Sequence, residues 1–224
     1  MSGATRVVAL LGHPVAHSLS PRMQNAAFAA RALDWVYVAL DVEPERLEEA
    51  VPGLDALGFA GANVTAPHKQ GVARILGSDL PSVNTILPGG RGVSTDAAIL
   101  EQVTHCNLPA ILGDGGAAAA FRHALPAARV FSRRGEWPPC VDDADVVINA
   151  TPVRDEVLVE LGEGQVLVDL PYPRSATADA AAAGGATVHD GLDVLVAQGA
   201  ASFELWTGVP APVDVMRRAV GLDA

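Results

Sequence analysis

Short apolar runs alternate with segments of helical periodicity along nearly the whole chain, and this alternation limits the possible folds more than any other feature. Residues 146–149 (VVIN) and 166–170 (VLVDL) are rich in β-branched side chains without polar alternation, as expected for parallel strands covered on both faces. Segments such as 44–57 carry leucine, alanine and valine at helical spacing. Regular alternation of this kind predicts an α/β protein.

The alternation falls into two blocks, which indicates two domains. In the first block we expect strands at residues 7–11, 35–40 and 61–65, helices at 21–32, 44–57 and 69–76, and a hairpin of 83–87 and 92–94. In the second we expect strands at 110–112, 128–131, 146–149, 166–170 and 187–189, and helices at 99–105, 117–125 and 176–183. Helices at 192–205 and 212–220 follow. The blocks meet near Asp96 and again near Gly191.

Composition argues against several classes of function. The formal net charge is −11, whereas nucleic-acid binding needs a surplus of Lys and Arg. No segment approaches the ~18 consecutive apolar residues of a membrane span, and the first apolar run is too short for a signal peptide, so we expect a cytoplasmic protein. The two cysteines form no CxxC pair and have no histidine at ligand spacing, so no metal site is expected.

A glycine-rich turn follows the strand expected at 110–112. Residues 113–118 read GDGGAA, which matches the G-x-G-x-x-A pattern of dinucleotide-binding turns. In that pattern the first glycine permits the tight turn, the second lets the backbone approach a pyrophosphate, and the helix N-terminus supplies amide donors. An ordinary tight turn is the alternative. Asp114 departs from this chemistry, because its carboxylate would repel a pyrophosphate unless the side chain turned outward.

The end of the next strand indicates which dinucleotide would bind. An NAD site has an acidic residue about 20 positions after the first glycine, to accept from the ribose 2′-hydroxyl, whereas an NADP site has arginine there. Ser132, Arg133 and Arg134 occupy this position, and no acid occurs until Glu136. Because guanidinium groups match a 2′-phosphate in charge and geometry, the sequence favours NADP. Two solvated arginines at a strand end are the alternative.

Two serines lie between the first strand and the first helix. Ser20 is followed by Pro21, a good pair for the N-cap and first position of a helix. Ser18 and Ser20 therefore offer two hydroxyl groups beside a helix N-terminus, which suits a carboxylate ligand. Capping alone would account for part of the role of Ser20 but not for Ser18.

Further polar residues recur where strands of the first block end. Thr65 and Lys69 follow the strand at 61–65, and open α/β sheets bind ligands at this carboxyl edge. Asn84 and Asp96 come from the neighbouring hairpin and could reach the same pocket. A single lysine or aspartate is usually only solvated, but the recurrence at several strand ends favours a ligand site.

Taken together, these segments make the sequence resemble the shikimate dehydrogenase family. The segments GHPVAHSLSP, GANVTAPHK, SVNTI, STDA, ILGDGGAA, INATP, DLPY with Thr177, and DGLDVLVAQGAASFELWTG occur in the family's order and span nearly the whole chain. The resemblance implies a substrate-binding domain of residues 1–96 and 191–224 and an NADP-binding Rossmann domain of residues 97–190. It also implies an oxidoreductase that reversibly reduces 3-dehydroshikimate to shikimate with NADPH, in chorismate and aromatic amino acid biosynthesis.

The resemblance also assigns roles to particular residues. Lys69 and Asp96 would form the catalytic pair, in which protonated Lys69 supplies a proton to the developing alkoxide and Asp96 orients the lysine. The substrate would contact Ser18, Ser20, Thr65, Asn84, Gln198 and, near the nicotinamide, Tyr172. The cofactor would contact Gly113, Gly115, Gly116, Ala117, Ser132, Arg133, Arg134, Asn149, Thr151 and Gly191.

The chain departs from the family pattern in length and at a few positions. It is shorter than is typical, and the missing length falls between residues 69 and 84, between 96 and 113, and after 152. Ser132 replaces the usual Asn, Val194 a frequent Met, and Ala97 a common Gly. Turnover of quinate or an aminoshikimate, and ligand binding without turnover, are therefore kept as alternatives. Assembly as a monomer or a homodimer is equally open.

Overall fold

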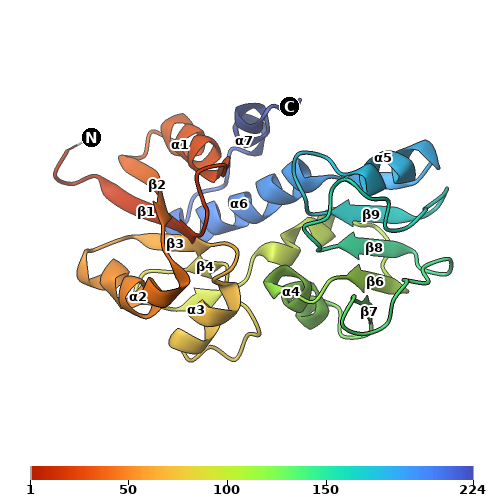
Figure 1. Ribbon diagram of the computed structural model, residues 1–224. Coiled ribbons are helices and arrows are strands. Elements are labelled where there is room, and N and C mark those ends of the chain that lie inside the picture. The colour runs from red at the N-terminus through yellow and green to blue at the C-terminus, as the bar shows by residue number, and fades with distance from the viewer. Residues whose placement is uncertain (1, 224) are drawn as a thin grey trace. The chain divides into compact units, whose positions relative to one another are not determined.

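A computed structural model describes residues 2–223, and within them the chain divides into two compact units. The first unit takes in the chain up to Thr95 and again from Val196, and the second runs from Asp96 to Leu195. Each unit has its own sheet with helices beside it, which confirms the α/β class (Figure 1). None of the helices within residues 2–223 is long and apolar enough to cross a membrane.

The sheet of the first unit has five strands in the order β2-β1-β3-β4-β5. These strands are β1 (Arg6–Gly12), β2 (Trp35–Asp41), β3 (Gly61–Val64), β4 (Thr85–Ile86) and β5 (Gly92–Val93). The central strand β1 is parallel to β2 and β3, whereas β4 pairs antiparallel with both β3 and β5. The expected hairpin is therefore present, and the parallel strands β1 and β3 end at a common carboxyl edge.

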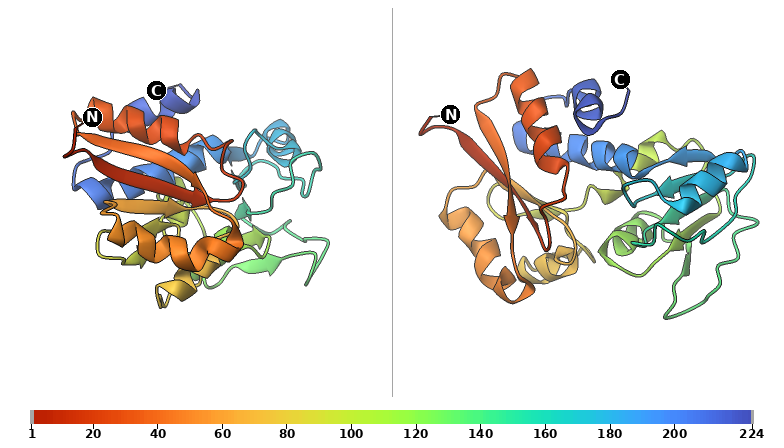
Figure 2. Two further views of the ribbon diagram at one scale, coloured as in Figure 1. Left: turned by 60° about the vertical axis from the view of Figure 1, so that its left-hand side comes forward. Right: turned by 45° about the horizontal axis from the view of Figure 1, so that its top comes forward.

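Helices cover both faces of this sheet. On one face lie α1 (Ser20–Ala30), the later part of α6 (Gly191–Thr207) and α7 (Val213–Val220), with α1 and α7 side by side (Figure 2). There the rings of Phe28 and Phe203 stack with centroids 5.4 Å apart. On the other face η1 (Pro44–Arg46), α2 (Leu47–Ala56) and α3 (Lys69–Ile75) follow the strands, and α2 and α3 pack against Ala9 and Leu11. Alternate residues of β1 thus face opposite helical layers.

The second unit contains a five-stranded, fully parallel sheet in the order β10-β9-β8-β6-β7. Its strands are β6 (Pro109–Leu112), β7 (Arg129–Phe131), β8 (Val146–Asn149), β9 (Val166–Asp169) and β10 (Thr187–His189). The helices α4 (Gly116–Ala124) and α5 (Ala176–Ala183) connect β6 to β7 and β9 to β10. The chain moves to the opposite side of β6 between β7 and β8, so β6 and β8 flank the switch point at which doubly wound sheets bind ligands.

Three segments of the second unit differ from regular α-helical crossovers. The helix expected at 99–105 is instead a 3₁₀ segment, η2 (Asp96–Gln102). After it, the Asp145 carboxylate holds the chain that leads into β6, because it accepts from the backbone N–H groups of Asn107 and Leu108, at 2.6 and 2.8 Å. Residues 132–145, between β7 and β8, and 150–165, between β8 and β9, form no helix. Val141 and Ala144 from the first connection, and Val159 and Leu161 from the second, fill the core instead.

Candidate functional site

The start of α1 corrects one prediction about the two serines. The helix begins at Ser20, and Leu19 occupies the cap position without a side-chain hydrogen bond. The Ser20 N–H instead donates to Ser18 Oγ at 3.2 Å, so Ser18 supplies the local hydroxyl acceptor that Ser20 was expected to provide. Ser20 itself is buried, whereas Ser18 is half-buried. Both serines still lie where β1 leads into α1, at the carboxyl edge of the sheet.

Thr65 and Lys69 lie at the same edge, directly after β3. The Thr65 N–H donates to the Leu11 carbonyl at 2.9 Å, and the Thr65 methyl group fits against Gly12, where a Cβ would overlap it. Lys69 begins α3, and its carbonyl accepts from the Val83 N–H at 3.0 Å. Both side chains are half-buried. The ends of β1 and β3 thus carry Ser18, Thr65 and Lys69 on adjacent loops.

Lys69 has a further property that composition reveals. It is the only lysine in the chain, and every other side chain counted in Lys+Arg is an arginine. Arginine is permanently charged and cannot exchange a proton at ordinary pH, whereas lysine can. A sequence that uses arginine everywhere else but lysine here is the pattern expected for a proton-transfer role. This signal is present in the sequence, but the motifs alone did not reveal it.

Asn84 is the centre of a buried polar network next to this edge. Only 2% of its surface is exposed, and its Oδ1 accepts from the Thr95 N–H at 2.8 Å. Its Nδ2 donates to Thr95 Oγ1 at 3.0 Å and lies 3.5 Å from Gln198 Oε1. The structure therefore brings together Asn84 and Gln198, two predicted substrate-binding residues from distant parts of the chain.

The network continues through residues to which no role was assigned from sequence. Asn63, in the middle of β3, accepts from the Tyr37 hydroxyl at 2.9 Å and donates to both Thr85 Oγ1 and Ser202 Oγ at 3.0 Å. Ser202 also donates to the Gln198 carbonyl at 2.9 Å. A buried polar side chain needs partners, so an asparagine within an apolar strand was the available signal. These bonds hold α6, and with it Gln198, against β3 and β4.

In the second unit the glycine-rich turn connects β6 to α4 at the switch point. Gly113 has φ +118°, a conformation that favours glycine, and Gly115 caps α4, which begins at Gly116. A Cβ at Gly115 would meet no atom within 4 Å, so its backbone is open to an approaching group. The amides of Gly116 and Ala117 lie in the first turn of α4. An open glycine face beside a helix N-terminus is the arrangement that binds a pyrophosphate.

The two arginines expected to select NADP lie in a turn after β7, and both are paired with acids. Arg133 Nη2 donates to Glu156 Oε2 at 2.8 Å, and Arg134 Nη1 lies 3.6 Å from Asp114 Oδ2. The turn is closed by the Gly135 N–H, which donates to the Ser132 carbonyl at 2.9 Å. Asp114 is exposed, so its side chain turns outward. The structure thereby places an arginine against the carboxylate that would otherwise repel a phosphate.

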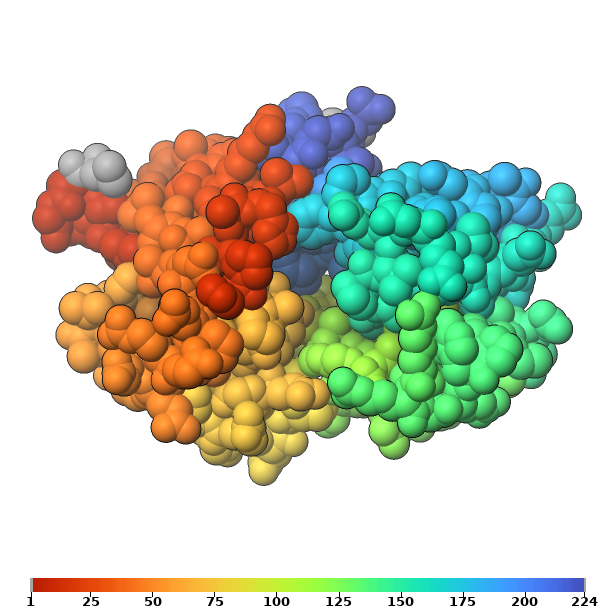
Figure 3. Space-filling model, viewed as in Figure 1, coloured from red at the N-terminus to blue at the C-terminus, as the bar shows by residue number. Residues whose placement is uncertain are grey.

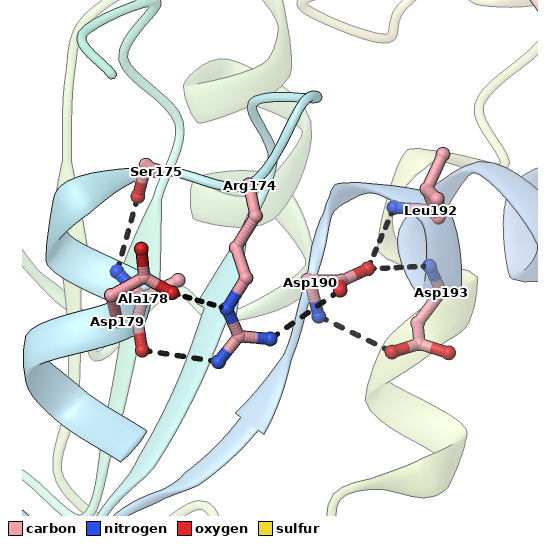
Figure 4. Close-up of polar contacts among 7 residues, drawn as sticks. All are labelled: Arg174, Ser175, Ala178, Asp179, Asp190, Leu192 and Asp193. Atoms are coloured by element: carbon pink, nitrogen blue, oxygen red, sulfur yellow. Dashed lines mark hydrogen bonds and ion pairs between the residues drawn. The ribbon is translucent and has the colours of Figure 1, made fainter. Parts of the chain in front are cut away.

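The loop that carries Tyr172 leads from β9 into α5 and is tied to the residues before α6 (Figure 4). Arg174 donates from Nε to Asp179 Oδ1 at 2.8 Å, and its Nη1 lies 3.5 Å from Asp190 Oδ2. Asp190 in turn accepts from the Leu192 N–H at 2.9 Å. One arginine therefore connects the first turns of α5 and α6.

Gly191, the first residue of α6, packs directly on this loop. A Cβ at Gly191 would overlap the Pro171 carbonyl, which explains why glycine occupies the position. Asn149 is the last residue of β8 and is bonded to Thr151, whose backbone lies beside Gly113. The predicted cofactor residues around the switch point, Gly113, Gly115, Asn149 and Thr151, thus lie on two adjacent loops of one unit.

Asp96 begins η2 and is buried, with 6% of its surface exposed. It opens the second unit, whereas Lys69 belongs to the first. Their pairing in catalysis stays a prediction.

A surface pocket of about 810 Å³ lies elsewhere in the first unit. Its walls come from β2, η1 and α2, part of the orange surface in Figure 3, and include Leu40, Leu54 and Phe59. His13 and Asp41, which form an exposed pair with a 2.7 Å separation, also line it. None of the predicted site residues does, so this pocket takes no part in the site proposed below.

The fold and the site define an α/β protein of two units. One unit has a doubly wound sheet with a dinucleotide-binding turn, and the other has polar side chains at the carboxyl edge of its sheet. The family model "Shikimate dehydrogenase substrate binding domain" matches residues 10–86, and the model "Shikimate 5'-dehydrogenase C-terminal domain" matches residues 191–220. The chain belongs to the shikimate dehydrogenase family, because it is also 38% identical, over 98% of its length, to the shikimate dehydrogenase (NADP(+)) of Anaeromyxobacter dehalogenans, of which 97% is covered.

Other relatives and solved structures to which the chain is similar include further shikimate dehydrogenases. The shikimate dehydrogenase (NADP(+)) of Moorella thermoacetica is 39% identical, with 97% of this chain and 93% of that protein covered. The Thermus thermophilus shikimate 5-dehydrogenase, solved with NADP(H) and shikimate, superposes with a TM-score of 0.81 at 30% identity, covering 96% and 98% of the two chains. The Aquifex aeolicus enzyme gives a TM-score of 0.87 at 29% identity, with 99% of each chain covered.

The comparison with Anaeromyxobacter also bears on chain length. The alignment extends over 270 positions, whereas this chain has 224 residues, so stretches of the relative have no counterpart here. The second unit has little regular secondary structure at the 3₁₀ segment η2 and in the helix-free connections at residues 132–145 and 150–165.

Proposed function

We propose that this protein is a shikimate dehydrogenase that reversibly reduces 3-dehydroshikimate to shikimate with NADPH. The observation that carries the proposal is the single lysine, Lys69, at a sheet edge that also holds Ser18, Thr65 and the Asn84 network. The similarity to NADP(+)-dependent relatives over nearly the full length supports it.

The two units would divide the binding between them. The unit with the mixed sheet would bind substrate: Ser18 and Ser20 would hold its carboxylate, and Thr65, Asn84 and Gln198 would bind its hydroxyl groups. The assignment to this sheet rests on the polar residues that converge at one carboxyl edge. The second unit would bind the cofactor, with residues 1–96 and 191–224 forming the substrate domain and 97–190 the cofactor domain.

The residues of the second unit fit NADP. Gly115 leaves open space above the turn, and the first amides of α4 can donate to a pyrophosphate. Ser132, Arg133 and Arg134, at the end of β7, can surround a 2′-phosphate. Gly113, Asn149 and Thr151 shape the loops on either side, while Tyr172 and Gly191 lie at the β9 side of the same sheet. When bound, NADPH supplies the hydride that reduces the ketone.

The proton would come from the protein. Lys69 in its ammonium form donates a proton to the carbonyl oxygen as that oxygen gains negative charge, and takes it back in the reverse direction. Asp96 would accept a hydrogen bond from the lysine and orient it. Lysine suits this role because it can lose and regain a proton, which arginine cannot do.

The test measures NADPH formation with NADP⁺ and shikimate, with quinate and a blank without substrate in parallel, and each again with NAD⁺. We expect turnover of shikimate with NADP⁺ and a kcat for Lys69→Ala and Lys69→Arg that is lower by about 10²–10⁴-fold. Lys69→Arg keeps the positive charge and is the matched control for electrostatic binding, so its KM for shikimate should stay near that of the wild type.

Other outcomes would overturn the proposal. Absence of turnover with a shikimate-dependent rise in melting temperature would identify a ligand-binding protein. Faster turnover of quinate than of shikimate would assign the alternative substrate, and full activity of Lys69→Ala would refute the proton-transfer role. A cytoplasmic location and assembly as a monomer or homodimer stay predictions, the latter testable by sedimentation equilibrium.

A further inference from the structure

A fully buried carboxyl group lies behind the two loops of the switch point. Asp169 is the last residue of β9 and is 0% exposed. It is the register partner of Asn149 at the end of β8, and its Oδ1 accepts from Asn149 Nδ2 at 2.7 Å. The function proposed above gives Asp169 no role. Its partner Asn149, however, is one of the residues predicted to contact the cofactor.

The hydrogen bonds around Asn149 leave its amide only one orientation. Its Oδ1 accepts two bonds from Thr151, from the backbone N–H at 3.1 Å and from Oγ1 at 2.7 Å. Because the backbone N–H can only donate, the amide oxygen must face Thr151, and the amide nitrogen must then face Asp169. A carboxyl oxygen at position 169 is the acceptor that makes this orientation the favoured one. Without that acceptor, the buried Nδ2 would lose its partner.

The oriented amide holds the loop after β8 against the glycine-rich turn. Thr151 Oγ1 accepts from the Val153 N–H at 3.3 Å, so Thr151 fixes the residues on both sides of Pro152. A Cβ at Gly113 would lie 3.1 Å from the Ala150 carbonyl oxygen and 3.4 Å from the Thr151 nitrogen. The first glycine of the turn therefore packs on the backbone that Asn149 positions. A shift of this loop would displace or obstruct the turn.

We propose that Asp169 is a positioning residue that acts through Asn149 and Thr151 to hold the loop after β8 in place against the glycine-rich turn, and so sets the affinity for the dinucleotide. The part of this inference that concerns the dinucleotide rests on the proposed function. The part that concerns the loop does not, because the chain of bonds from Asp169 to Thr151 lies wholly within the second unit.

The surroundings of Asp169 reinforce this role. Burial raises the pKa of the Asp169 carboxyl, and hydrogen bonds from Ser175 and Asn149 offset that effect only in part. Asp190 adds a like charge, while Arg174 lies 3.5 Å from Asp190. Ser175 is the N-cap of α5, where its Oγ accepts from the Ala178 N–H at 3.1 Å. Asp169 thus lies near the residue that caps α5 as well.

The first experiment measures hydrogen exchange of the Thr151 amide by NMR in the protein without added ligand. In the wild type this N–H is bonded to Asn149, so it should be protected. We expect about tenfold faster exchange in Asp169→Ala, the effect of losing one modest hydrogen bond. Asp169→Asn keeps an acceptor oxygen for Asn149 and should restore protection. Should Asp169→Ala not fold, Asp169→Val fills the volume without supplying an acceptor and takes its place.

The second experiment measures KM for NADP⁺ and for shikimate. Asp169→Ala should raise KM for NADP⁺ about tenfold, while KM for shikimate and kcat at saturating NADP⁺ change little. The matched control is Ala181→Gly. Ala181 is equally buried in the same unit, near the end of α5, where it packs in the apolar core and the substitution weakens the helix. It should lower the melting temperature without changing either KM or the exchange of Thr151.

The two readouts separate the possible failures. Unchanged Thr151 exchange in the variant that lacks the acceptor would refute the positioning role, whatever the wild type binds. Faster exchange in a protein that has no affinity for NADP⁺ would refute the proposed function and leave the role of Asp169 in the loop intact. Equal effects of Asp169→Ala and Ala181→Gly on KM for NADP⁺ would show that general destabilisation, not positioning, is the cause.

Discussion

Arg134 Nη1 lies 3.6 Å from Asp114 Oδ2, so one of the two arginines expected to bind a 2′-phosphate is paired with the acid inside the glycine-rich turn. Arg133 is paired in the same way, with Glu156 at 2.8 Å. All four side chains are exposed to solvent, Asp114 the least at 46%, and exposed pairs of this kind contribute at most about 1 kcal/mol. A 2′-phosphate could therefore compete for either arginine at small cost.

Replacing Asp114 tests whether this pairing weakens cofactor binding. Asp114→Asn removes the negative charge next to the pyrophosphate position and releases Arg134, so KM for NADP⁺ should fall by about two- to fivefold, in line with a surface ion pair. The fall should shrink as ionic strength rises, because salt screens exposed charges. Steady-state kinetics at low and high salt measure both effects. An unchanged or higher KM would show that Asp114 does not oppose the cofactor.

Replacing both arginines tests cofactor selection. The double variant Arg133→Ala/Arg134→Ala should raise KM for NADP⁺ by about 10- to 100-fold, since charge-assisted hydrogen bonds to a phosphate would be lost. KM for NAD⁺ should stay within about twofold, because NAD⁺ lacks the 2′-phosphate. Arg129→Ala is the matched control: this arginine is on β7 and pairs with Asp143. A proportional loss with both cofactors would contradict the assignment.

Two glycines of the second unit should respond in opposite ways to alanine. Gly115 has an ordinary φ of −81° and open space around its Cβ position, so Gly115→Ala should fold with an unchanged or slightly higher melting temperature. KM for NADP⁺ should nevertheless rise at least about tenfold, since the methyl group occupies the approach to the turn. Gly191→Ala, whose Cβ would overlap the Pro171 carbonyl, should lower the melting temperature clearly. Unchanged cofactor affinity in Gly115→Ala would place the pyrophosphate elsewhere.

The stability of the second unit should depend on pH through Asp145. Desolvation acts to raise the pKa of its carboxyl group, but hydrogen bonds from backbone N–H groups, those of Asn107 and Leu108 first, outweigh it and lower the pKa below its ordinary value of 3.8. A carboxyl with a lowered folded-state pKa stabilises the fold above its unfolded pKa, and this stabilisation is lost as pH falls through the folded value.

The corresponding variant is Asp145→Asn. Its melting temperature should be about 2–4 °C below that of the wild type at pH 7, and the difference should shrink once pH falls below about 4. Thermal melts at neutral, mildly acidic and strongly acidic pH measure it, with Asp142→Asn as a control for an exposed carboxylate. A difference that is independent of pH would show that the charge of Asp145 does not contribute.

Local patterns predicted most of the secondary structure. The strands at 146–149 and 187–189 and the helix at 176–183 were expected with the bounds that the structure shows. Hydrophobic periodicity and turn residues specify such elements locally, so their existence can be inferred from a few consecutive residues. The helix expected at 99–105 is a 3₁₀ segment that ends at Gln102, and the chain that follows it is held before β6 by Asp145, a residue 38 positions after Asn107.

In the candidate site, too, features set by local sequence could be predicted, whereas features set by distant residues could not. The glycine-rich turn and the serines beside α1 could be located because they depend on local backbone geometry. Ser20 was expected to cap α1, but Ser18 accepts the hydrogen bond instead. Which serine caps the helix changes when the first helical residue shifts by a single position. The roles of Asn63 and Ser202 were missed because Asn63 bonds to Thr85, 22 residues later, and to Ser202, 139 residues later.

The sequence by itself determined the α/β class, the order of the family's motifs, the dinucleotide-type turn and the position of the only lysine. Only the tertiary structure decided which acids pair with Arg133 and Arg134, that Gln198 lies beside Asn84, and that Asp169 orients Asn149. The physical reason is the distance along the chain over which each kind of interaction acts. Backbone propensity and periodicity act over a few residues, whereas a buried polar group takes its partner from whichever strand or helix packing brings next to it.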